Sequence, residues 1–115
     1  MFLSHIDEIA SKTISGDGVK NIEKQALIGP EQGWKGQVMR RFVLTDGGHT
    51  PKHSHPWPHT VLVLEGEGEL FYEGETFPLK AGSVAQVTEN REHQFRQSSK
   101  EPFAFICIVP EEGDA

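Results

Sequence analysis

Short apolar segments separated by glycine-containing turns run through the chain from residue 19 onward, and this pattern restricts it to a β structure. The segments are rich in Val, Ile, Phe and Leu, and turn residues such as the pair Gly47–Gly48 and Gly66 lie between them. Helical periodicity is confined to the first dozen residues, where we expect one or two turns. About eight short strands in one small domain predict an all-β sandwich or barrel. The predicted strands are residues 19–28, 37–44, 59–66, 68–74, 75–82, 83–88, 92–97 and 103–110.

Length, charge and cysteine content narrow the class of protein. A chain of 115 residues can bury one core but not two, so we predict a single domain over residues 1–115. The net charge of −6 disfavours binding to nucleic acid or to an anionic membrane, because both need clustered Lys and Arg. Cys107 is the only cysteine, so no disulfide forms within the chain. The chain shows neither a signal peptide nor a membrane span, and we expect a cytoplasmic protein with a solvated tail at residues 110–115.

Three histidines lie within seven residues, directly before an apolar segment. Residues two apart in a strand share a face, so His53, His55 and His59 would point the same way, and Val61 would continue that face inward. A fourth histidine, His93, opens another predicted strand. A single histidine is more often a core or surface residue than a ligand, and three on one loop can form a solvated patch. The repeated offsets favour a metal site over these alternatives.

The spacing of these histidines and of the glycines around them resembles the two motifs of the cupin superfamily. The first motif runs here from Gly47, through the three clustered histidines, to Gly66. The resemblance covers nearly the whole chain, with motif one at 47–66 and motif two at 82–97. It implies an all-β cupin domain, a double-stranded β-helix (jelly-roll) barrel. The positions that match the second motif in spacing are Gly82, Thr88, Asn90, His93 and Gln97.

This chain departs from the family pattern at the third ligand position, where cupins usually carry Glu and this chain has His59. It therefore resembles the small single-domain cupins with four histidines, among which manganese or iron centres and oxygen-dependent chemistry are known. Motif two lacks its Pro and Gly, although Asn90 can take the left-handed conformation that Gly supplies. The resemblance implies that His53, His55, His59 and His93 hold one divalent first-row ion. Manganese or iron is favoured, and Ni, Cu, Co and Zn stay open because imidazole suits them all.

Strand parity assigns candidate residues to a substrate pocket beside this site. Phe95 shares the face of the fourth histidine. Arg40 shares the apolar face of its strand, where it would bind a substrate carboxylate or superoxide. The alternative is a register in which Arg40 faces solvent or a partner chain. Phe105 and Cys107 lie on a strand that can face inward, with a buried structural thiol as the favoured role of the cysteine. We expect Trp57 at the mouth of the cavity or against a neighbouring subunit.

Four neutral ligands would leave a bound divalent ion its full charge. Such a site should be a strong Lewis acid that favours anionic, chelating substrates. An octahedral ion would keep two positions for a small-molecule substrate and dioxygen, whereas a tetrahedral zinc would keep none and be structural. We predict a metal-dependent, dioxygenase-like oxidoreductase that acts on a small organic substrate. A non-catalytic ligand-binding or sensor protein and a Lewis-acid isomerase are the alternatives.

We also predict a homodimer, because several strands are apolar on both faces.

Overall fold

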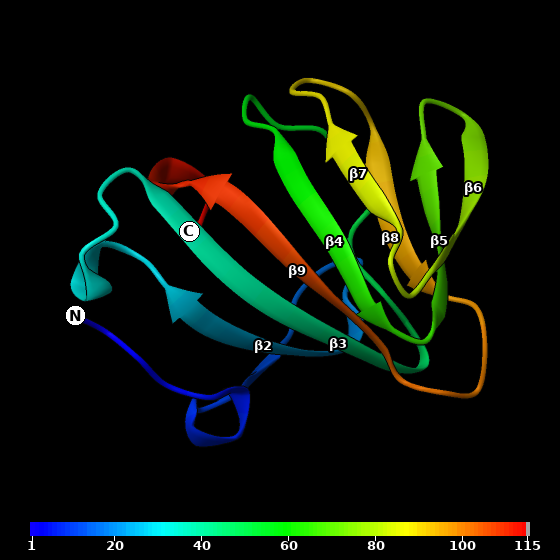
Figure 1. The fold of residues 1–115 in the computed structure, drawn as a ribbon. Coiled ribbons are helices and arrows are strands. Elements are labelled where there is room, and N and C mark those ends of the chain that lie inside the picture. The colour runs from blue at the N-terminus through cyan, green and yellow to red at the C-terminus, as the bar shows by residue number, and fades with distance from the viewer. Residues whose placement is uncertain (115) are drawn as a thin grey trace.

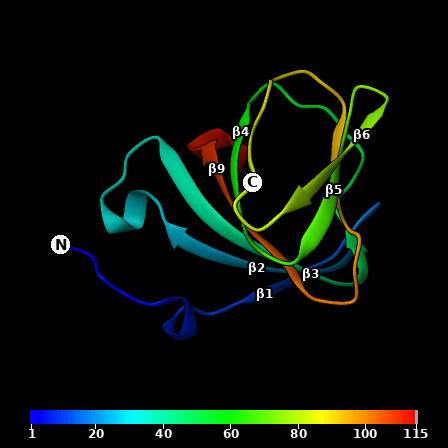
Figure 2. The same ribbon diagram turned by 45° about the vertical axis from the view of Figure 1, so that its right-hand side comes forward.

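The computed structural model describes residues 1–114, and its architecture is one antiparallel sheet that curls around a single core (Figures 1 and 2). The hydrogen-bonded order of the strands is β6-β5-β8-β3-β9-β4-β7, while β2 pairs with β3 and β1 pairs with β2. The predicted all-β barrel class is confirmed. The elements are η1 (Ile6–Glu8), β1 (Lys12–Ile14), β2 (Lys20–Ile28), η2 (Pro30–Gln32), β3 (Gln37–His49), β4 (His59–Glu65), β5 (Glu67–Tyr72), β6 (Glu75–Lys80), β7 (Val84–Val87), β8 (His93–Gln97), β9 (Phe103–Pro110) and η3 (Glu111–Gly113).

Two differences from the predicted strands lie in the first half of the chain. The pair Gly47–Gly48 was interpreted as a turn, but β3 continues through it to His49. Asp46 and Gly47 have φ angles of 48° and 75°, and the pairing with β2 shifts register at this point. The left-handed residues therefore make a bulge inside a long strand instead of a reversal. The short strand β1 was not predicted, because three residues are too few to show a period.

The core fills the inside of the curl and is made of alternate residues from the long strands. Val61 and Val63 on β4 are buried, which confirms the inward direction expected for this face. Phe103 on β9 is completely buried, and its ring lies against Gly68 on β5. A Cβ atom at Gly68 would come within 2.4 Å of this ring, so the backbone of β5 packs directly on the phenylalanine.

The sheet is closed by a connection and not by a ladder. Its two end strands, β6 and β7, follow each other in sequence and are joined by residues 81–83. This turn bonds to β4, because Gly82 N–H donates to the Val63 carbonyl and Val63 N–H donates to the Ser83 carbonyl, both at 2.9 Å. Within residues 1–114, no ladder pairs β6 with β7. The barrel therefore has a seam between these strands.

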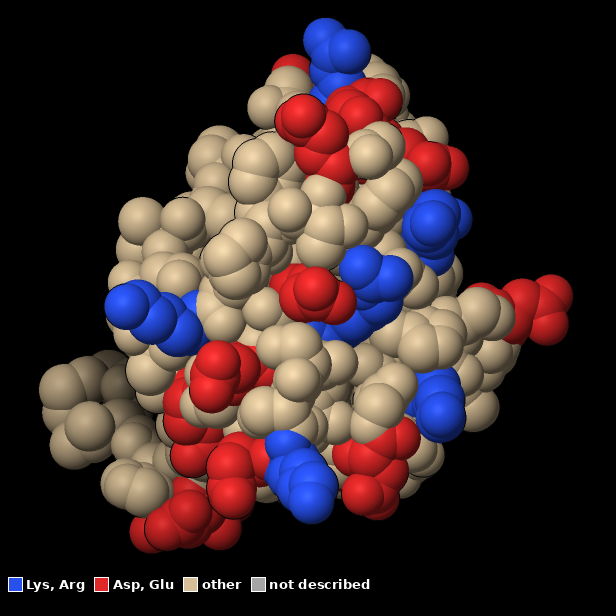
Figure 3. Space-filling view, turned by 90° about the vertical axis from the view of Figure 1, so that its right-hand side faces the viewer, with Lys and Arg blue, Asp and Glu red and all other residues tan. Residues whose placement is uncertain are grey.

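The surface carries mixed charge. On the face shown in Figure 3, Lys and Arg are interspersed with Asp and Glu, and several acidic side chains lie next to one another along its lower left edge. Among the described residues, no helix is long and apolar enough to cross a membrane.

The expectation of a solvated tail holds only in part. Glu111 and Glu112 are exposed, whereas Asp114 is half-buried and its carboxylate lies 2.7 Å from the Lys24 ammonium.

Candidate metal centre

Three histidines from distant parts of the chain meet at one end of the barrel. His53 and His55 lie on the connection between β3 and β4, and His93 is the first residue of β8. One ring nitrogen from each can be chosen so that all three lie within 4.8 Å of one another. The backbones of His53 and His93 exchange two hydrogen bonds, with N–O distances of 3.1 and 2.9 Å. The predicted convergence of the two motifs is therefore present for these three residues.

The reason for this convergence differs from the one expected. Residues 50–58 do not form a strand, so strand parity does not explain why His53 and His55 face the same way. Prolines in this segment remove ladder donors. The loop is tied instead to the second motif, because Asn90 N–H donates to the His55 carbonyl at 2.7 Å. Asn90 has a φ of 63°, which confirms the left-handed conformation predicted for it.

His59 begins β4 and lies beside the group of three, but it is not part of that compact group. Its Nε2 atom is 2.8 Å from Nε2 of His55. Its ring centroid is 4.6 Å from that of His55 and 5.1 Å from that of His93. All four predicted histidines thus share one end of the barrel, and the role of His59 as a fourth ligand belongs to the proposal below.

The outer ring nitrogens are held by backbone carbonyls. Nδ1 of His55 lies 2.8 Å from the Trp57 carbonyl, and Nδ1 of His93 lies 2.9 Å from the Arg91 carbonyl. A carbonyl only accepts hydrogen bonds, so these Nδ1 atoms carry the protons and the Nε2 atoms keep their lone pairs, of which that of His55 faces Nε2 of His59. Nε2 of His93 is buried and has no hydrogen-bond partner. An orphaned lone pair among other imidazoles fits a cation, and carbonyl-oriented histidines are typical of metal ligands.

Trp57 lies at the outer side of the cluster, as expected for a residue at the mouth. Its ring stacks on that of His55, with centroids 4.6 Å apart and planes 12° from parallel. On its other side it contacts η3, where a Cβ atom at Gly113 would come within 2.7 Å of the indole. The indole therefore covers the His55 ring and limits its movement.

A cavity of about 130 Å³ adjoins the histidines. Arg40 lines it and is only 6% exposed, so the solvent-facing alternative is wrong. Its Nη2 atom lies 3.2 Å from Sγ of Cys107 and 3.4 Å from Nδ1 of His59. Burial raises the pKa of the Cys107 thiol, against the opposing effect of Arg40. The predicted pocket residues Phe95 and Phe105 also line the cavity, together with Ile14, Val19, Ile22, Phe42, Thr50, Pro51, His53, His59, His93 and Cys107.

Some cavity residues were not found from the sequence. Ile14 lies on the unpredicted strand β1, and Thr50 follows the bulge of β3. The Thr50 hydroxyl accepts a hydrogen bond from the Phe95 backbone N–H at 2.9 Å and so holds β8 beside the histidine loop. The segment Lys12–Ile14 contains a single apolar residue, Ile14, so it carries no alternation from which a strand could be predicted.

The environment of the cluster keeps its imidazoles neutral. Although much of His53 is exposed, desolvation of its ring lowers its pKa to about 4, and the rings of His93 and His55 add to the shift. Burial, followed by the Arg40 guanidinium, lowers the pKa of His59 to about 2. Burial also lowers the pKa values of His55 and His93. Neutral imidazole is the form that binds metal, so the site is prepared for an ion at neutral pH.

The same shifts predict that the metal-free protein loses stability in mild acid. A histidine of the unfolded chain takes up a proton near pH 6.5, whereas folded His59 resists protonation down to about pH 2. Below pH 6.5 the unfolded state therefore binds more protons, and lowering the pH favours it. We expect about 1 kcal/mol of lost stability at pH 5.5 from His59 alone. Thermal unfolding of chelator-treated protein at pH 7.5 and 5.5 measures this loss, which should shrink in His59→Gln. The same melting temperature at both pH values would contradict this explanation.

Comparisons with known proteins agree with the geometry. The family model described as "Cupin domain" matches residues 40–109, which is more than half of the chain. The 1-methylthio-D-xylulose 5-phosphate methylsulfurylase of Rhodospirillum rubrum is 26% identical over 109 residues, which cover 95% of this chain and 69% of that protein. The polyketide synthase CurC of Streptomyces cyaneus is 28% identical over 97 residues. The match covers 84% of this chain and spans 60% of that relative.

Solved structures give the same result for the fold. The polyketide cyclase RemF from Streptomyces resistomycificus superposes with a TM-score of 0.89 at 25% identity, over 96% of this chain and 79% of that one. A protein from Thermotoga maritima described as a "predicted oxalate decarboxylase" superposes with a TM-score of 0.86 at 23% identity, over 95% of this chain and 98% of that one. The second likeness concerns the fold alone. With its family model, its curled sheet and its histidines at the motif positions, this chain belongs to the cupin family.

Proposed function

We propose that this protein is a metal-dependent enzyme that converts a small organic molecule in the cavity beside its histidine cluster. His53, His55, His59 and His93 would hold one divalent first-row ion, with manganese or iron favoured. One observation carries the proposal: the buried Nε2 atom of His93 has no hydrogen-bond partner and lies among three further imidazoles. The short Nε2–Nε2 distance of 2.8 Å between His55 and His59 supports the inclusion of His59.

The cavity defines what the chain itself contributes. Its walls are mostly apolar, so a bound molecule would be shielded from water on the sides away from the histidines. Arg40 places a positive charge on the same cavity, next to His59. A bound ion would supply Lewis acidity toward a substrate oxygen and, for manganese or iron, also redox chemistry of the dioxygenase-like kind expected from the sequence. The stacked Trp57 and the backbone carbonyls would keep the histidine rings oriented.

The relatives support an enzyme over a purely ligand-binding protein or sensor. Two of them carry the names of a methylsulfurylase and a polyketide cyclase. These names cover different chemistries, so the oxidative form of the proposal stays a prediction beside the Lewis-acid form. A cytoplasmic location also stays a prediction.

Metal analysis followed by paired aerobic and anaerobic assays tests the proposal. Protein prepared without an affinity tag should contain close to one first-row ion per chain, and it should lose turnover of diketone, catechol or thiol substrates after chelation. Turnover that consumes dioxygen supports the dioxygenase-like form, and turnover that persists without it supports the Lewis-acid form. A protein that binds no first-row ion after reconstitution would contradict the proposal.

We also propose the homodimer that the sequence predicts. Leu62 and Val84 are 42% and 77% exposed, and they line an apolar groove on the outer face of β4, β7 and β9. No charged residue lines this groove. A twofold pair would bury the same patch on both chains. Light scattering should give the mass of two chains, and Leu62→Lys with Val84→Lys should give the mass of one. A monomeric parent protein at micromolar concentration would exclude the dimer.

A further inference from the structure

Arg40 is a buried cation whose charge is only partly compensated. Its Nη2 atom contacts sulfur and imidazole, neither of which bears a negative charge when neutral. Its Nε atom is buried and has no hydrogen-bond partner among residues 1–114. Its guanidinium carbon lies 4.9 Å from the centroid of the Phe42 ring. A buried guanidinium is costly unless an anion pairs with it, so these contacts leave room for a negatively charged partner.

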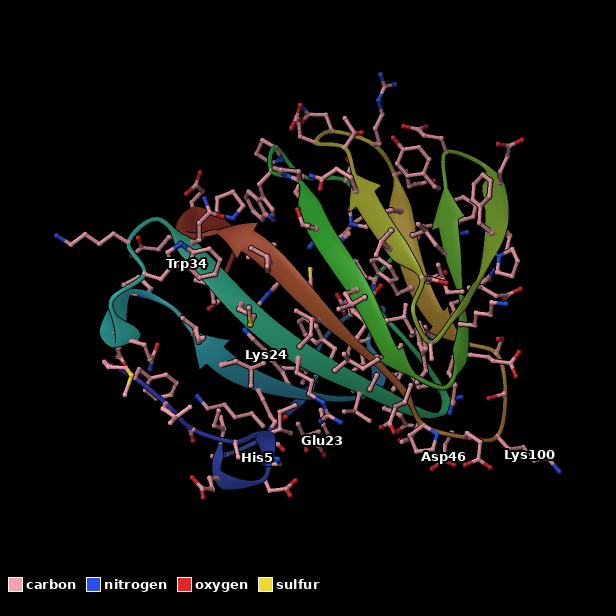
Figure 4. All side chains as sticks on the ribbon, in the orientation of Figure 1. His5, Glu23, Lys24, Trp34, Asp46 and Lys100 are labelled. Atoms are coloured by element: carbon pink, nitrogen blue, oxygen red, sulfur yellow. The ribbon has the colours of Figure 1, made fainter. Side chains whose placement is uncertain are left out.

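Asp114 supplies part of this negative charge. Its Oδ1 atom lies 3.6 Å from Nη1 of Arg40 and 2.7 Å from Nζ of Lys24. Among the described residues, it is the one carboxylate within ion-pair distance of Arg40. The contact with Arg40 is longer than a hydrogen bond, so the carboxylate is held mainly by Lys24, which projects from β2 (Figure 4). Arg40 thus has an internal ion-pair partner, Asp114, that compensates its positive charge only in part.

Lys24, one member of this ion pair, lines a hollow that continues from the cavity toward the surface. A second hollow shares Arg40 and two of the cluster histidines with the cavity, and it continues outward to Lys24, Trp57 and Gly113. A molecule that enters this way would pass Lys24, whose ammonium lies 2.7 Å from the Asp114 carboxylate, before it reaches the histidines. Its anionic group would bind to Lys24 and Arg40, the two cations that Asp114 contacts in this structure. Its remaining atoms would enter the cavity.

We propose that Arg40 and Lys24 form an anion subsite, that Asp114 fills this subsite when no ligand is present, and that a small carboxylate with a compact apolar body displaces it. The proposal deepens the proposed function, because it names the substrate class of the same pocket, but the subsite itself is built from residues that need no metal. The apolar walls and the cavity of about 130 Å³ set the size. An apolar cavity of about 150 Å³ accommodates benzene, so a branched acid of four carbons matches the space. Guanidinium groups recognise carboxylates through two parallel N–H donors, and the unpaired Nε atom leaves one of them free.

The test uses isobutyrate and its uncharged isostere isobutyramide, titrated into chelator-treated protein and followed by ¹H–¹⁵N NMR. Isobutyrate should bind more tightly than the amide and should shift the amide signals of Lys24 and Asp114. Asp114→Asn removes the internal competitor and should tighten isobutyrate binding about fivefold, which corresponds to the loss of one moderately screened ion pair. Lys24→Met should weaken it about threefold. The matched control Lys80→Met removes an exposed cation on β6 and should change nothing.

The outcomes separate this inference from the proposed function. Equal binding of acid and amide, no binding of isobutyrate to Asp114→Asn, or no effect of either substitution overturns the anion subsite. Metal binding is measured separately on the same samples. Anion exchange in a protein that binds no first-row ion would leave the subsite in place and reject the metal-dependent function, and the reverse result would reject only the subsite.

Discussion

Replacing His93 by alanine is expected to lower the affinity for a divalent first-row ion by more than about a hundredfold. Loss of a residue that merely orients a ligand typically costs ten- to a hundredfold, and this substitution removes a proposed ligand itself. His93 is the residue that joins the second motif to the loop of the first, so its loss leaves the other histidines without a ligand from the opposite side. Equilibrium dialysis against cobalt(II) measures the affinity directly.

Two further variants make this result specific. His93 is buried, so alanine also leaves a small void, whereas His53 is exposed and His53→Ala should lose the ion without that defect. His5 lies outside the cluster on the exposed η1 turn, and His5→Ala should bind cobalt like the parent.

Trp57 stacks on His55 and should report binding by fluorescence once Trp34, on the connection between β2 and β3 (Figure 4), is replaced by phenylalanine. Equal cobalt affinity in the parent and the His93 variant would exclude the metal centre.

Phe103→Ala is expected to destabilise the protein by about 3–5 kcal/mol. The ring is completely buried, its centroid lies 5.3 Å from that of Phe105, and it packs directly on the backbone at Gly68. Backbone cannot move to fill the space as a flexible side chain would, so most of the cavity should remain. Small domains have about 5–15 kcal/mol of stability in total, and this one substitution would remove a large part of it.

Urea denaturation, fitted with one m-value for the parent and the variants, measures the loss in free energy of unfolding. Phe77→Ala is the matched control, because the same side chain on β6 is 44% exposed and should cost about 0.5 kcal/mol or less. A loss below about 1 kcal/mol in Phe103→Ala would mean that β5 and β9 collapse onto each other and that Gly68 does not hold them apart.

The strands could be predicted because their signals are local, whereas the histidine cluster was predicted from the resemblance to the two cupin motifs and is built by long-range contacts. Alternation within β4 placed Val61 and Val63 inside, and the fixed offsets of His53 and His55 within a short loop restricted where their rings could go. The left-handed Asn90 was likewise a property of one residue and its neighbours. The alternation within β4 and the conformation of Asn90 depend on few long-range contacts, so a sequence pattern is enough to find them.

The parts that could not be predicted depend on the packing of distant segments. Arg40 and Cys107 are opposite each other only because β3 and β9 pair in one register, and a shift by one residue would turn Arg40 outward. The pairing of Asp114 with Lys24 and Arg40 joins the end of β9 to two earlier strands, and nothing in the acidic segment from Glu111 to Asp114 distinguishes it from a solvated run. The bulge at Asp46 and Gly47 resembled a turn, because the same residue types serve both.

The seam between β6 and β7 makes the barrel a split ring, which can widen more easily than a closed one. In a closed barrel every strand is bonded to two neighbours, and any increase in girth breaks a ladder. Outward movement of β5, β6 and β8 from β4 would break the two hydrogen bonds of residues 82 and 83, and it would also separate Gly68 from the Phe103 ring. His93 lies on this part, and His59 lies on β4. Metal bound by both would clasp the ring across its gap, so loading the site would also set how wide the cavity can open.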